Sequence, residues 1–484
     1  MQRVLLAAFL LAPLPLAAQG DVVARVDAWY QSTQRRAPGT WGVVVADQTG
    51  RVLWSVNATE PMTPASTVKL LTTGFARTVV GANARRATRV VGSGGVDPTT
   101  GTWVGRWSLE LNGDPTLERP DRAGPTLASL AEQLAAIGVR RLTGPLSLST
   151  QVGDPVATYP TAWDGRHRGR SFAPLVGPVT LNENLVAFTV APGSNVKQKP
   201  YVAGDAPRGA GRLVSITART VVGTRSRLTV RSDGKGGWVV GGTIGTRAAP
   251  RRYVFTAPNP ARVVEAAWTD ALARSGIEWA KGPSIGAVGA PTPRVLAEVV
   301  SMPFDSIAHE VNTRSLNIGA ELMLLWGGGA DRAAERLTQH VRTVTGLSGD
   351  LVHLEDGSGL SDRDRVAPLA FTTYLARFPE TAAGRDFPLL LPANGSGTLR
   401  RLGRGMEAGS VRAKTGTLAR VSSLVGYLGH SSGMLLVAAM YNGPRAGDAR
   451  VAQWELFRAL GANGVAIPPT PADDADALGG PVLQ

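Results

Sequence analysis

Apolar positions in the first part of the chain follow a helical spacing and then a strand-like one. A first helix, capped by Asp21, is predicted from apolar residues that recur three and four positions apart, namely Val22, Val26 and Trp29. The apolar runs 41–46 and 52–56 flank a Gln-Thr-Gly turn, which is typical of a β-hairpin. A further helical pattern begins near Pro64. The chain therefore opens with a mixture of helix and antiparallel sheet.

The pattern changes between about 88 and 289, where Gly, Thr, Val and Arg dominate. Short strand-like runs such as 107–111 and 226–230 recur there, which predicts a mostly β region. Two helices interrupt it. One starts at Thr126 as its cap, and the other has Asn259 as its cap with Pro260 in the first helical position.

Helical spacing returns after about 290 and is followed by a long strand-like run, 422–441, which is broken by a His-Ser-Ser-Gly turn. We expect two antiparallel strands there and a last helix over 448–460. Residues 466–484 are rich in Pro and Asp, which predicts a disordered tail. No internal repeat is found.

The N-terminal residues 1–18 resemble a secretory signal, with Arg3, a short apolar run and a small-residue end. That run is too short to span a bilayer, although a retained anchor is the alternative. We expect an exported protein that is periplasmic or otherwise extracytoplasmic. The chain has no Cys, so disulfides, thiolate metal sites and a lipid-carrying Cys are excluded.

Basic residues outnumber acidic ones by 51 to 37, for a net charge of +14. Such a surplus favours contact with polyanions. Nucleic acid is a poor candidate because the arginines are dispersed and export is expected. An anionic cell-wall polymer or a membrane surface suits the location better, and an Arg-biased composition that serves solubility is the plain alternative.

Three short motifs stand in one order, Ser66-Thr67-Val68-Lys69, Ser315-Leu316-Asn317 and Lys414-Thr415-Gly416. Only six of the 51 basic residues are Lys, and two of those six stand in these motifs. Arg cannot lose its proton in a protein, whereas a desolvated Lys can act as a base. Ser-x-x-Lys occurs three times, but only the copy at Ser66 enters a predicted helix, with Thr63 as N-cap and Pro64 next.

The chemistry of these residue types fits a serine nucleophile. Residues three apart share a helix face, which places the Lys69 amine beside the Ser66 hydroxyl. The Ser66 N–H at the helix start is free to bind an oxyanion. Ser315 could relay a proton and Asn317 could hold a substrate amide, while Lys414 on a strand could bind a substrate carboxylate.

Together the motifs resemble the serine acyltransferases of the penicillin-binding and β-lactamase kind. The long gap between the first two motifs is similar to that of the D-alanyl-D-alanine carboxypeptidase/endopeptidase family, peptidase family S13 (low-molecular-mass class C penicillin-binding proteins). Further family-like stretches are 112–117, 181–184 and 356–361. The resemblance covers about 25–465.

The resemblance implies an α/β (α+β) transpeptidase-like domain, in which helices pack on an antiparallel sheet. We expect this catalytic domain to be discontinuous, formed by 19–88 and 290–465. The region 89–289 would be a mostly β insertion of two small domains.

The resemblance also implies an activity, a serine-type D-Ala-D-Ala carboxypeptidase with endopeptidase action as a further reaction. Its substrates would be peptidoglycan stem peptides, its covalent inhibitors β-lactams, and no cofactor or metal would be needed. Ser66, Lys69, Ser315, Asn317 and Lys414 would be catalytic.

In the same family pattern, the backbone N–H groups of Ser66 and Thr417 would form the oxyanion hole. Four residues would contact substrate, namely Thr415, Gly416, Thr417 and Ser358. Asp362 stands where the family commonly has Arg, which leaves the preferred stem peptide open.

Other functions remain as alternatives. A β-lactamase or esterase would share the three motifs, and an inactive wall-binding protein would use only the basic surface. His309-Glu310 lacks a second His four residues on, so no zinc motif forms. Gly-x-Ser-x-Gly occurs around Ser284 and Ser431, but neither copy opens a helix as a nucleophile elbow must.

Overall fold

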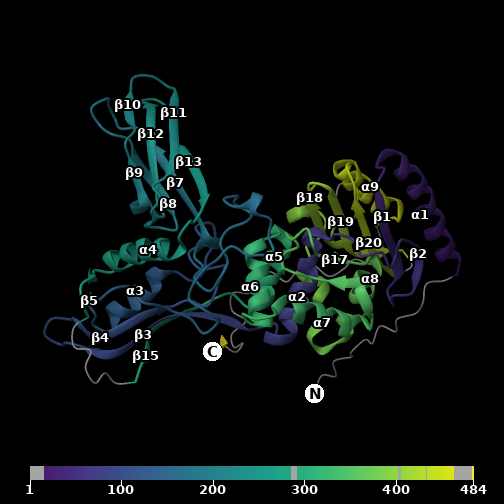
Figure 1. Cartoon of the computed structure of the whole chain (residues 1–484), viewed down its shortest axis with the longest axis horizontal. Helices are drawn as coiled ribbons and strands as arrows, with labels where there is room; N and C mark the ends of the chain where they lie inside the picture. The colour runs from purple at the N-terminus through teal and green to yellow at the C-terminus, as the bar shows by residue number, and fades with distance from the viewer. Residues whose placement is uncertain (1–15, 285–291, 402–404, 432, 463–481, 484) are drawn as a thin grey trace, which may run out of the picture. The chain divides into compact units, whose positions relative to one another are not determined.

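The computed structural model describes residues 16–284, 292–401, 405–431, 433–462 and 482–483 (Figure 1). The chain forms two compact units. The first takes in the described residues up to Ala82 and those from Ala308 to residue 462, and the second consists of Asn83–Ile307 with residues 482–483. Most of the predicted signal, 1–18, and of the predicted tail, 466–484, lies outside the described residues.

An antiparallel sheet is the centre of the first unit. Within the described residues its strand order is β18-β19-β20-β1-β2. The strands are β1 (Thr40–Asp47), β2 (Val52–Val56), β18 (Val411–Leu418), β19 (Val421–His430) and β20 (Gly433–Asn442). The predicted β1–β2 hairpin and the predicted pair of strands over 422–441 are therefore confirmed.

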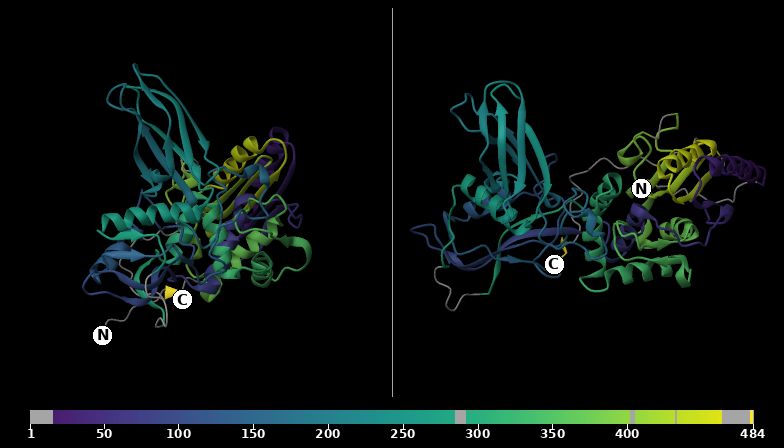
Figure 2. Two further views of the ribbon diagram at one scale, coloured as in Figure 1. Left: turned by 60° about the vertical axis from the view of Figure 1, so that its left-hand side comes forward. Right: turned by 45° about the horizontal axis from the view of Figure 1, so that its top comes forward.

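Two terminal helices, α1 (Leu16–Arg36) and α9 (Ala446–Ala459), lie side by side on this unit (Figures 1 and 2). Val22, Val26 and Trp29 are buried, and the Trp29 indole donates a 2.7 Å hydrogen bond to the Ala452 carbonyl. Asp21 does not cap the helix as predicted, because α1 already begins at Leu16 and Asp21 pairs with Arg25 inside it.

A helical layer carries the first two motifs. Its helices are α2 (Val68–Val80), α5 (Phe304–Arg314), α6 (Asn317–Gly328), α7 (Ala333–Thr345) and α8 (Pro368–Arg377). The predicted start of the motif helix is wrong. Ala65 has a φ of 50°, and a 3₁₀ turn, η1 (Ala65–Thr67), precedes α2. Thr63 makes no cap, and its backbone N–H donates to Asn442 Oδ1.

In the second unit, the lower part is a sheet of order β15-β3-β4-β6, and β21 (Val482–Leu483) also pairs with β3. Its strands are β3 (Arg85–Val96), β4 (Trp103–Glu110), β6 (Leu148–Ser149) and β15 (Arg294–Val300). The unit reaches beyond the predicted 89–289, because β3 pairs with β15 from Ala87 to Gly92.

The helices α3 (Leu127–Ala136) and α4 (Pro260–Arg274) begin at the predicted caps Thr126 and Asn259. A small parallel pair consists of β5 (Arg141–Thr143) and β14 (Glu278–Ala280).

The segment 185–256 of this unit, which we call the arm, consists of two further sheets (Figure 1). One has the order β13-β7-β8, and in the other β10, β12 and β11 are neighbours and β9 also pairs with β12. The strands are β7 (Leu185–Ala191), β8 (Tyr201–Ala206), β9 (Val214–Ile216), β10 (Arg219–Val221), β11 (Ser226–Ser232), β12 (Trp238–Gly245) and β13 (Arg251–Thr256). Its buried side chains join those of the lower part in one apolar cluster, which includes Trp103, Trp107, Trp238 and Trp268. These tryptophans serve the core.

Candidate active site

Ser66 and Lys69 lie next to each other where the 3₁₀ turn passes into α2. The Lys69 amine is 3.0 Å from the Ser66 hydroxyl, within hydrogen-bond distance. Ser66 is half-buried and Lys69 is fully buried. The predicted three-residue spacing therefore brings the two side chains together, although Ser66 is in the 3₁₀ turn and not in the α-helix itself.

Two more acceptors hold the Lys69 amine in place. The amine donates to Asn317 Oδ1 at 2.6 Å and to the Ser358 carbonyl at 2.6 Å. Asn317 opens α6, so the second motif contacts the first through this amide. Ser358 is itself fully buried, and its hydroxyl donates to Asp356. Its contribution here is the main-chain carbonyl, and burial keeps its side chain from the substrate contact that the family pattern implies.

Burial sets the protonation of Lys69. Removal from water lowers the pKa of the Lys69 amine to about 8, well below an ordinary lysine, while the nearby carboxyl groups of Asp356, Glu321 and Asp364 act in the opposite direction. An amine with a pKa of about 8 is partly deprotonated near neutral pH. Lys69 can therefore accept a proton from Ser66.

Three buried carboxyl groups lie behind Lys69. Burial and the charge of Asp356 raise the pKa of Glu321 to about 8, and the same two causes raise the pKa of Asp364 well above its usual range. The Asp356 carboxylate accepts hydrogen bonds from the backbone N–H groups of 358–361, which fixes the loop that holds Lys69. Sequence reasoning missed Glu321, although it stands four residues after Asn317 and so shares its helix face.

The third motif meets the second through its lysine. The Lys414 amine donates to Ser315 Oγ at 2.9 Å and to the Thr415 carbonyl at 2.9 Å. Lys414 is fully buried, and burial followed by the charge of Lys69 lowers its pKa well below that of an ordinary lysine. The five predicted catalytic residues thus form one connected set in the first unit.

Close backbone approaches join the motifs. A Cβ atom on Gly416 would lie 2.5 Å from the Pro64 carbonyl oxygen and 3.2 Å from the Ser66 nitrogen. Gly359 has a φ of 73°, and a Cβ atom there would lie 1.9 Å from the Ala65 carbonyl oxygen. Only glycine fits either position. Gly416 therefore brings β18 against the main chain of Ser66, which is a reason for glycine that the sequence did not reveal.

Two positions in the motif region have strained backbones. Ala65 has a φ of 50° and Ser315 a φ of 58°, both in the left-handed region that non-glycine residues rarely adopt. Each lies beside or within a motif. Such strain is stored where the surrounding structure fixes a functional side chain.

A hollow of about 230 Å³ opens beside β18. It is lined by Thr398, Thr415, Gly416, Thr417, Ser422, Ser423, Leu424, Arg450, Gln453 and Trp454. The Arg450 guanidinium, from α9, donates to Thr417 Oγ1 at 3.1 Å. Sequence reasoning missed Arg450, because α9 lies far along the chain from the motifs. The exposed Arg450 guanidinium and the hydroxyl groups of Thr415 and Thr417 are suited to an anionic group.

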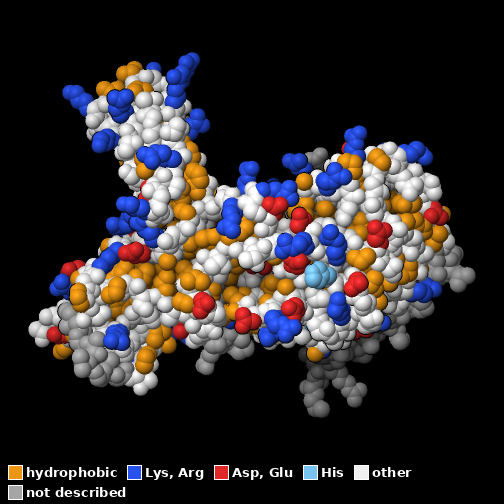
Figure 3. Space-filling model, viewed as in Figure 1, with side chains coloured by type: hydrophobic (Ala, Val, Ile, Leu, Met, Phe, Trp, Pro, Cys, Tyr) orange, Lys and Arg blue, Asp and Glu red, His pale blue; other side chains and the backbone are white. Residues whose placement is uncertain are grey.

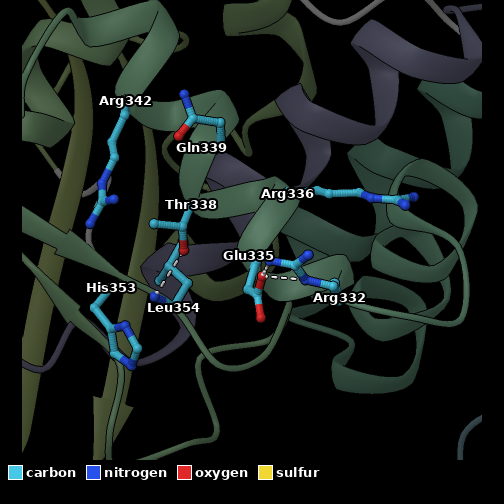
Figure 4. Close-up of a pocket in the computed structure, with 8 residues that line it drawn as sticks. All are labelled: Arg332, Glu335, Arg336, Thr338, Gln339, Arg342, His353 and Leu354. Carbon is cyan, nitrogen blue, oxygen red and sulfur yellow. Dashed lines mark hydrogen bonds and ion pairs between the residues drawn. The ribbon is translucent and has the colours of Figure 1, made fainter.

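A larger hollow, of about 520 Å³, lies along α7 and contains none of the predicted site residues (Figure 4). Its arginines have protein partners: Arg332 pairs with Glu335, Arg336 donates to the Gly328 carbonyl, and Arg342 donates to the Val352 carbonyl. We therefore place the site at Ser66. Among the described residues, no group of three or more His, Cys, Asp or Glu is arranged to hold a metal ion.

Asp362, which stands where the family commonly has Arg, lies at the edge of the loop that holds Lys69. The two arginines that follow it are exposed and bonded within the protein: Arg363 pairs with Glu355, and Arg365 donates to Thr63 Oγ1 at 3.0 Å. Both arginines are therefore engaged in local contacts.

Comparison with known proteins shows which relatives the chain resembles and to which family it belongs. It is 29% identical to a D-alanyl-D-alanine carboxypeptidase of Actinomadura sp. (strain R39), over 83% of this chain and 77% of that protein. It is also 29% identical to a carboxypeptidase of Mycobacterium tuberculosis, over 81% of this chain and 73% of that protein. Penicillin-binding protein 4 of Haemophilus influenzae has a similar fold, with a TM-score of 0.68 and 19% identity over 88% of this chain and 99% of that chain. The model of the D-Ala-D-Ala carboxypeptidase 3 (S13) family matches residues 22–458, and the chain belongs to this family.

Proposed function

We propose that this serine peptidase of the D-Ala-D-Ala carboxypeptidase type acts on peptidoglycan stem peptides through an acyl-enzyme on Ser66. The observation that carries the proposal is the Lys69 amine, which is fully buried, has a pKa lowered to about 8 and lies 3.0 Å from the Ser66 hydroxyl. A weak oxygen nucleophile needs such an adjacent base.

In the proposed reaction, Ser66 Oγ bonds to the carbonyl carbon of the penultimate D-Ala while Lys69 accepts the hydroxyl proton. The backbone N–H groups of Ser66 and Thr417 stabilise the oxyanion. Ser315, which accepts a hydrogen bond from Lys414 at 2.9 Å, passes a proton to the leaving amine as the C–N bond breaks, and the proton taken up by Lys69 replaces it. Water then attacks the ester carbonyl and gives a proton to Lys69, and that proton returns to Ser66 Oγ as the ester bond breaks and the shortened peptide leaves.

We assign the terminal carboxylate of the substrate to the hollow beside β18. Thr415 and Thr417 offer hydroxyl groups, and Arg450 adds a guanidinium whose fork matches a carboxylate. An arriving carboxylate would also favour the charged form of Lys414, whose pKa burial has lowered. Asn317, held by Lys69, would orient the peptide amide.

We further propose that the protein works outside the cytoplasm, at the cell wall, where stem peptides are found. β-Lactams, which imitate the D-Ala-D-Ala bond, would acylate Ser66 as inhibitors. Among the described residues, none of the helices has both the length and the apolar character needed to cross a membrane.

The direct test is covalent labelling by a fluorescent penicillin. Ser66→Ala should abolish labelling while the fold survives, because the bond-forming oxygen is gone. Ser194→Ala is the matched control, since Ser194 stands in a second, exposed Ser-x-x-Lys sequence with Lys197. Undiminished labelling of Ser66→Ala would refute the assignment, and rapid release of the adduct would favour a β-lactamase.

The balance between terminal trimming and cross-link cleavage needs a natural substrate. Mass analysis of products from intact cross-linked muropeptides would separate the two reactions. Loss of a single D-Ala mass indicates carboxypeptidase action, whereas conversion of dimers to monomers indicates endopeptidase action. Ser66→Ala should remove both.

A further inference from the structure

Positive charge is concentrated in the arm, residues 185–256. This segment holds twelve Lys and Arg against two Asp and no Glu, a net charge of +10 (12 − 2). The rest of the chain then holds 39 basic residues (51 − 12) and 35 acidic ones (37 − 2), a net charge of +4. A general preference for Arg would raise the charge everywhere, so it does not explain this distribution.

All twelve basic side chains of the arm are exposed. They are Lys197, Lys199, Arg208, Arg212, Arg219, Arg225, Arg227, Arg231, Lys235, Arg247, Arg251 and Arg252. Among the described residues, only Arg208 of this set has an ion-pair partner, Asp270 at 3.8 Å. The two acidic residues of the arm are engaged by the main chain: Asp205 accepts from the Gly211 N–H, and Asp233 accepts from the Lys235 and Gly237 N–H groups.

Part of this charge forms a row along one strand. Arg227 and Arg231 lie on the exposed face of β11, and Arg225 comes just before that strand, so the three share one side at multiples of two residues. Two residues span about 6.6 Å along a strand. A hollow of about 370 Å³ at this end of the arm is lined in part by Arg225 and Arg227. Basic side chains occur along the visible face of the arm at the upper left of Figure 3.

We propose that the arm binds a linear polyanion of the cell envelope, a polymer with repeated phosphate or carboxylate groups. A row of unpaired guanidinium groups matches repeated anionic groups in charge and in its linear arrangement. The other basic residues lie in the β7–β8, β8–β9, β11–β12 and β12–β13 connections and on β10 and β13, so a long chain could contact several parts of the arm at once. That the polymer belongs to the envelope rests on the proposed function, whereas the polyanion chemistry does not.

A lipid surface fits these observations less well. A membrane takes basic residues together with several apolar side chains on one flat side. The exposed large apolar residues of the arm do not belong to one strand or connection: Val196 lies between β7 and β8, Tyr201 on β8, Val221 and Val222 at the end of β10, and Val254 on β13. The charges belong to strands of two different sheets.

The test uses the full chain and two matched triple variants. In the arm variant, Arg225, Arg227 and Arg231 are each changed to Gln. The control changes Arg166, Arg168 and Arg170 to Gln, three exposed arginines of the same unit that are also two residues apart. Two of these have partners, since Arg166 pairs with Asp164 at 2.7 Å and Arg168 lies 4.1 Å from the Tyr159 ring centre.

Binding is measured to long-chain inorganic polyphosphate, to poly-L-glutamate, to duplex DNA and to vesicles of phosphatidylcholine with phosphatidylglycerol. We expect the wild type to bind polyphosphate with an affinity that falls as salt rises, and the arm variant to lose about tenfold while the control loses less than about twofold. Equal losses in both variants, binding to vesicles alone, or a preference for DNA would each overturn the proposal.

Penicillin acylation of the same variants separates this proposal from the proposed function. Both triple variants should acylate at the wild-type rate. Normal acylation without polyanion binding by the wild type would refute the arm proposal alone. Polyanion binding without acylation by the wild type would refute the proposed function alone.

Discussion

The two units differ in whether their functional basic side chains are buried or exposed. Around Ser66, Lys69 and Lys414 are fully buried, and every donor and acceptor they contact belongs to a motif or to its loop. On the arm, twelve basic side chains are exposed, and Arg208 is the one described member with an ion pair. Burial shifts the pKa of an amine and so prepares it for proton transfer, whereas exposure keeps a guanidinium charged and available to a partner.

The difference explains why Lys, and not Arg, stands at the two buried motif positions. Lys stands at both buried motif positions, where a charge must be gained or lost. Arg supplies most of the exposed charge on the arm, where it must stay. The two buried lysines therefore indicate chemistry at Lys69 and Lys414, whereas the arm holds nine Arg and three Lys, all exposed, so its role depends on charge and not on the kind of cation.

The largest effect is expected from exchanging the two kinds of cation at the site. Lys69→Arg should slow acylation by about 10²–10⁴, because Arg cannot give up its proton to become the base. Stopped-flow acylation by a chromogenic β-lactam measures the rate. Lys235→Arg is the control, since Lys235 is exposed on the arm and also ends a Ser-x-x-Lys sequence. A Lys69→Arg enzyme with the wild-type rate would contradict the role of Lys69 as base.

The next effect concerns pH. Because the neutral amine is the active form, the wild-type acylation rate should rise with pH around a midpoint of about 8, the pKa to which burial lowers Lys69. Glu321 helps to raise the pKa of Lys69, but the pKa of Glu321 is itself raised to about 8, so its carboxyl group is only partly charged at the midpoint; Glu321→Gln should therefore move the midpoint to lower pH by less than about one unit.

A merely structural role of Glu321 would lower the amount of active enzyme at every pH and leave the midpoint unchanged. Glu335→Gln, on the exposed side of α7, should leave the whole profile as it is. A midpoint that stays at about 8 in Glu321→Gln would mean that Glu321 does not influence the pKa of Lys69.

Elements of both units could be predicted from the sequence where the signals are local. The hairpin of β1 and β2, the caps at Thr126 and Asn259 and the two strands over 422–441 follow from residues within one turn or strand. The contacts among Ser66, Lys69, Ser315, Asn317 and Lys414 followed from the order of motifs together with the resemblance that they carry.

What escaped prediction depends on packing between distant segments. Ala65 adopts a positive φ at the point where Gly359 and Gly416 lie against the main chain of 64–66, so the local preference for a helix from Pro64 fails. Arg450 reaches Thr417 from a helix at the end of the unit.

A smaller effect is expected at the substrate carboxylate. Arg450→Gln should raise KM for a peptide ending in D-Ala-D-Ala by up to about tenfold, with a smaller change in kcat, since it removes one charge-assisted contact. The same peptide with a C-terminal amide should show no further loss, because the partner of Arg450 is already missing. Arg445→Gln, which removes an exposed ion pair with Asp448, is the control. Equal losses on acid and amide would contradict the assignment.

The smallest effect is expected where charge does not serve the fold at all. Neutralising Arg227 and Arg231 should change the free energy of unfolding by no more than about 0.5 kcal/mol, because neither side chain is buried or has an ion pair in the described structure. Relief of repulsion within a +10 segment would make that change, if anything, stabilising. Thermal unfolding of the double variant beside the wild type measures it. A large loss of stability would mean that these arginines stabilise the fold. They would then differ from the buried lysines in exposure but not in serving a binding partner. Stability unchanged together with weakened polyanion binding would show that the arm keeps these charges for a partner.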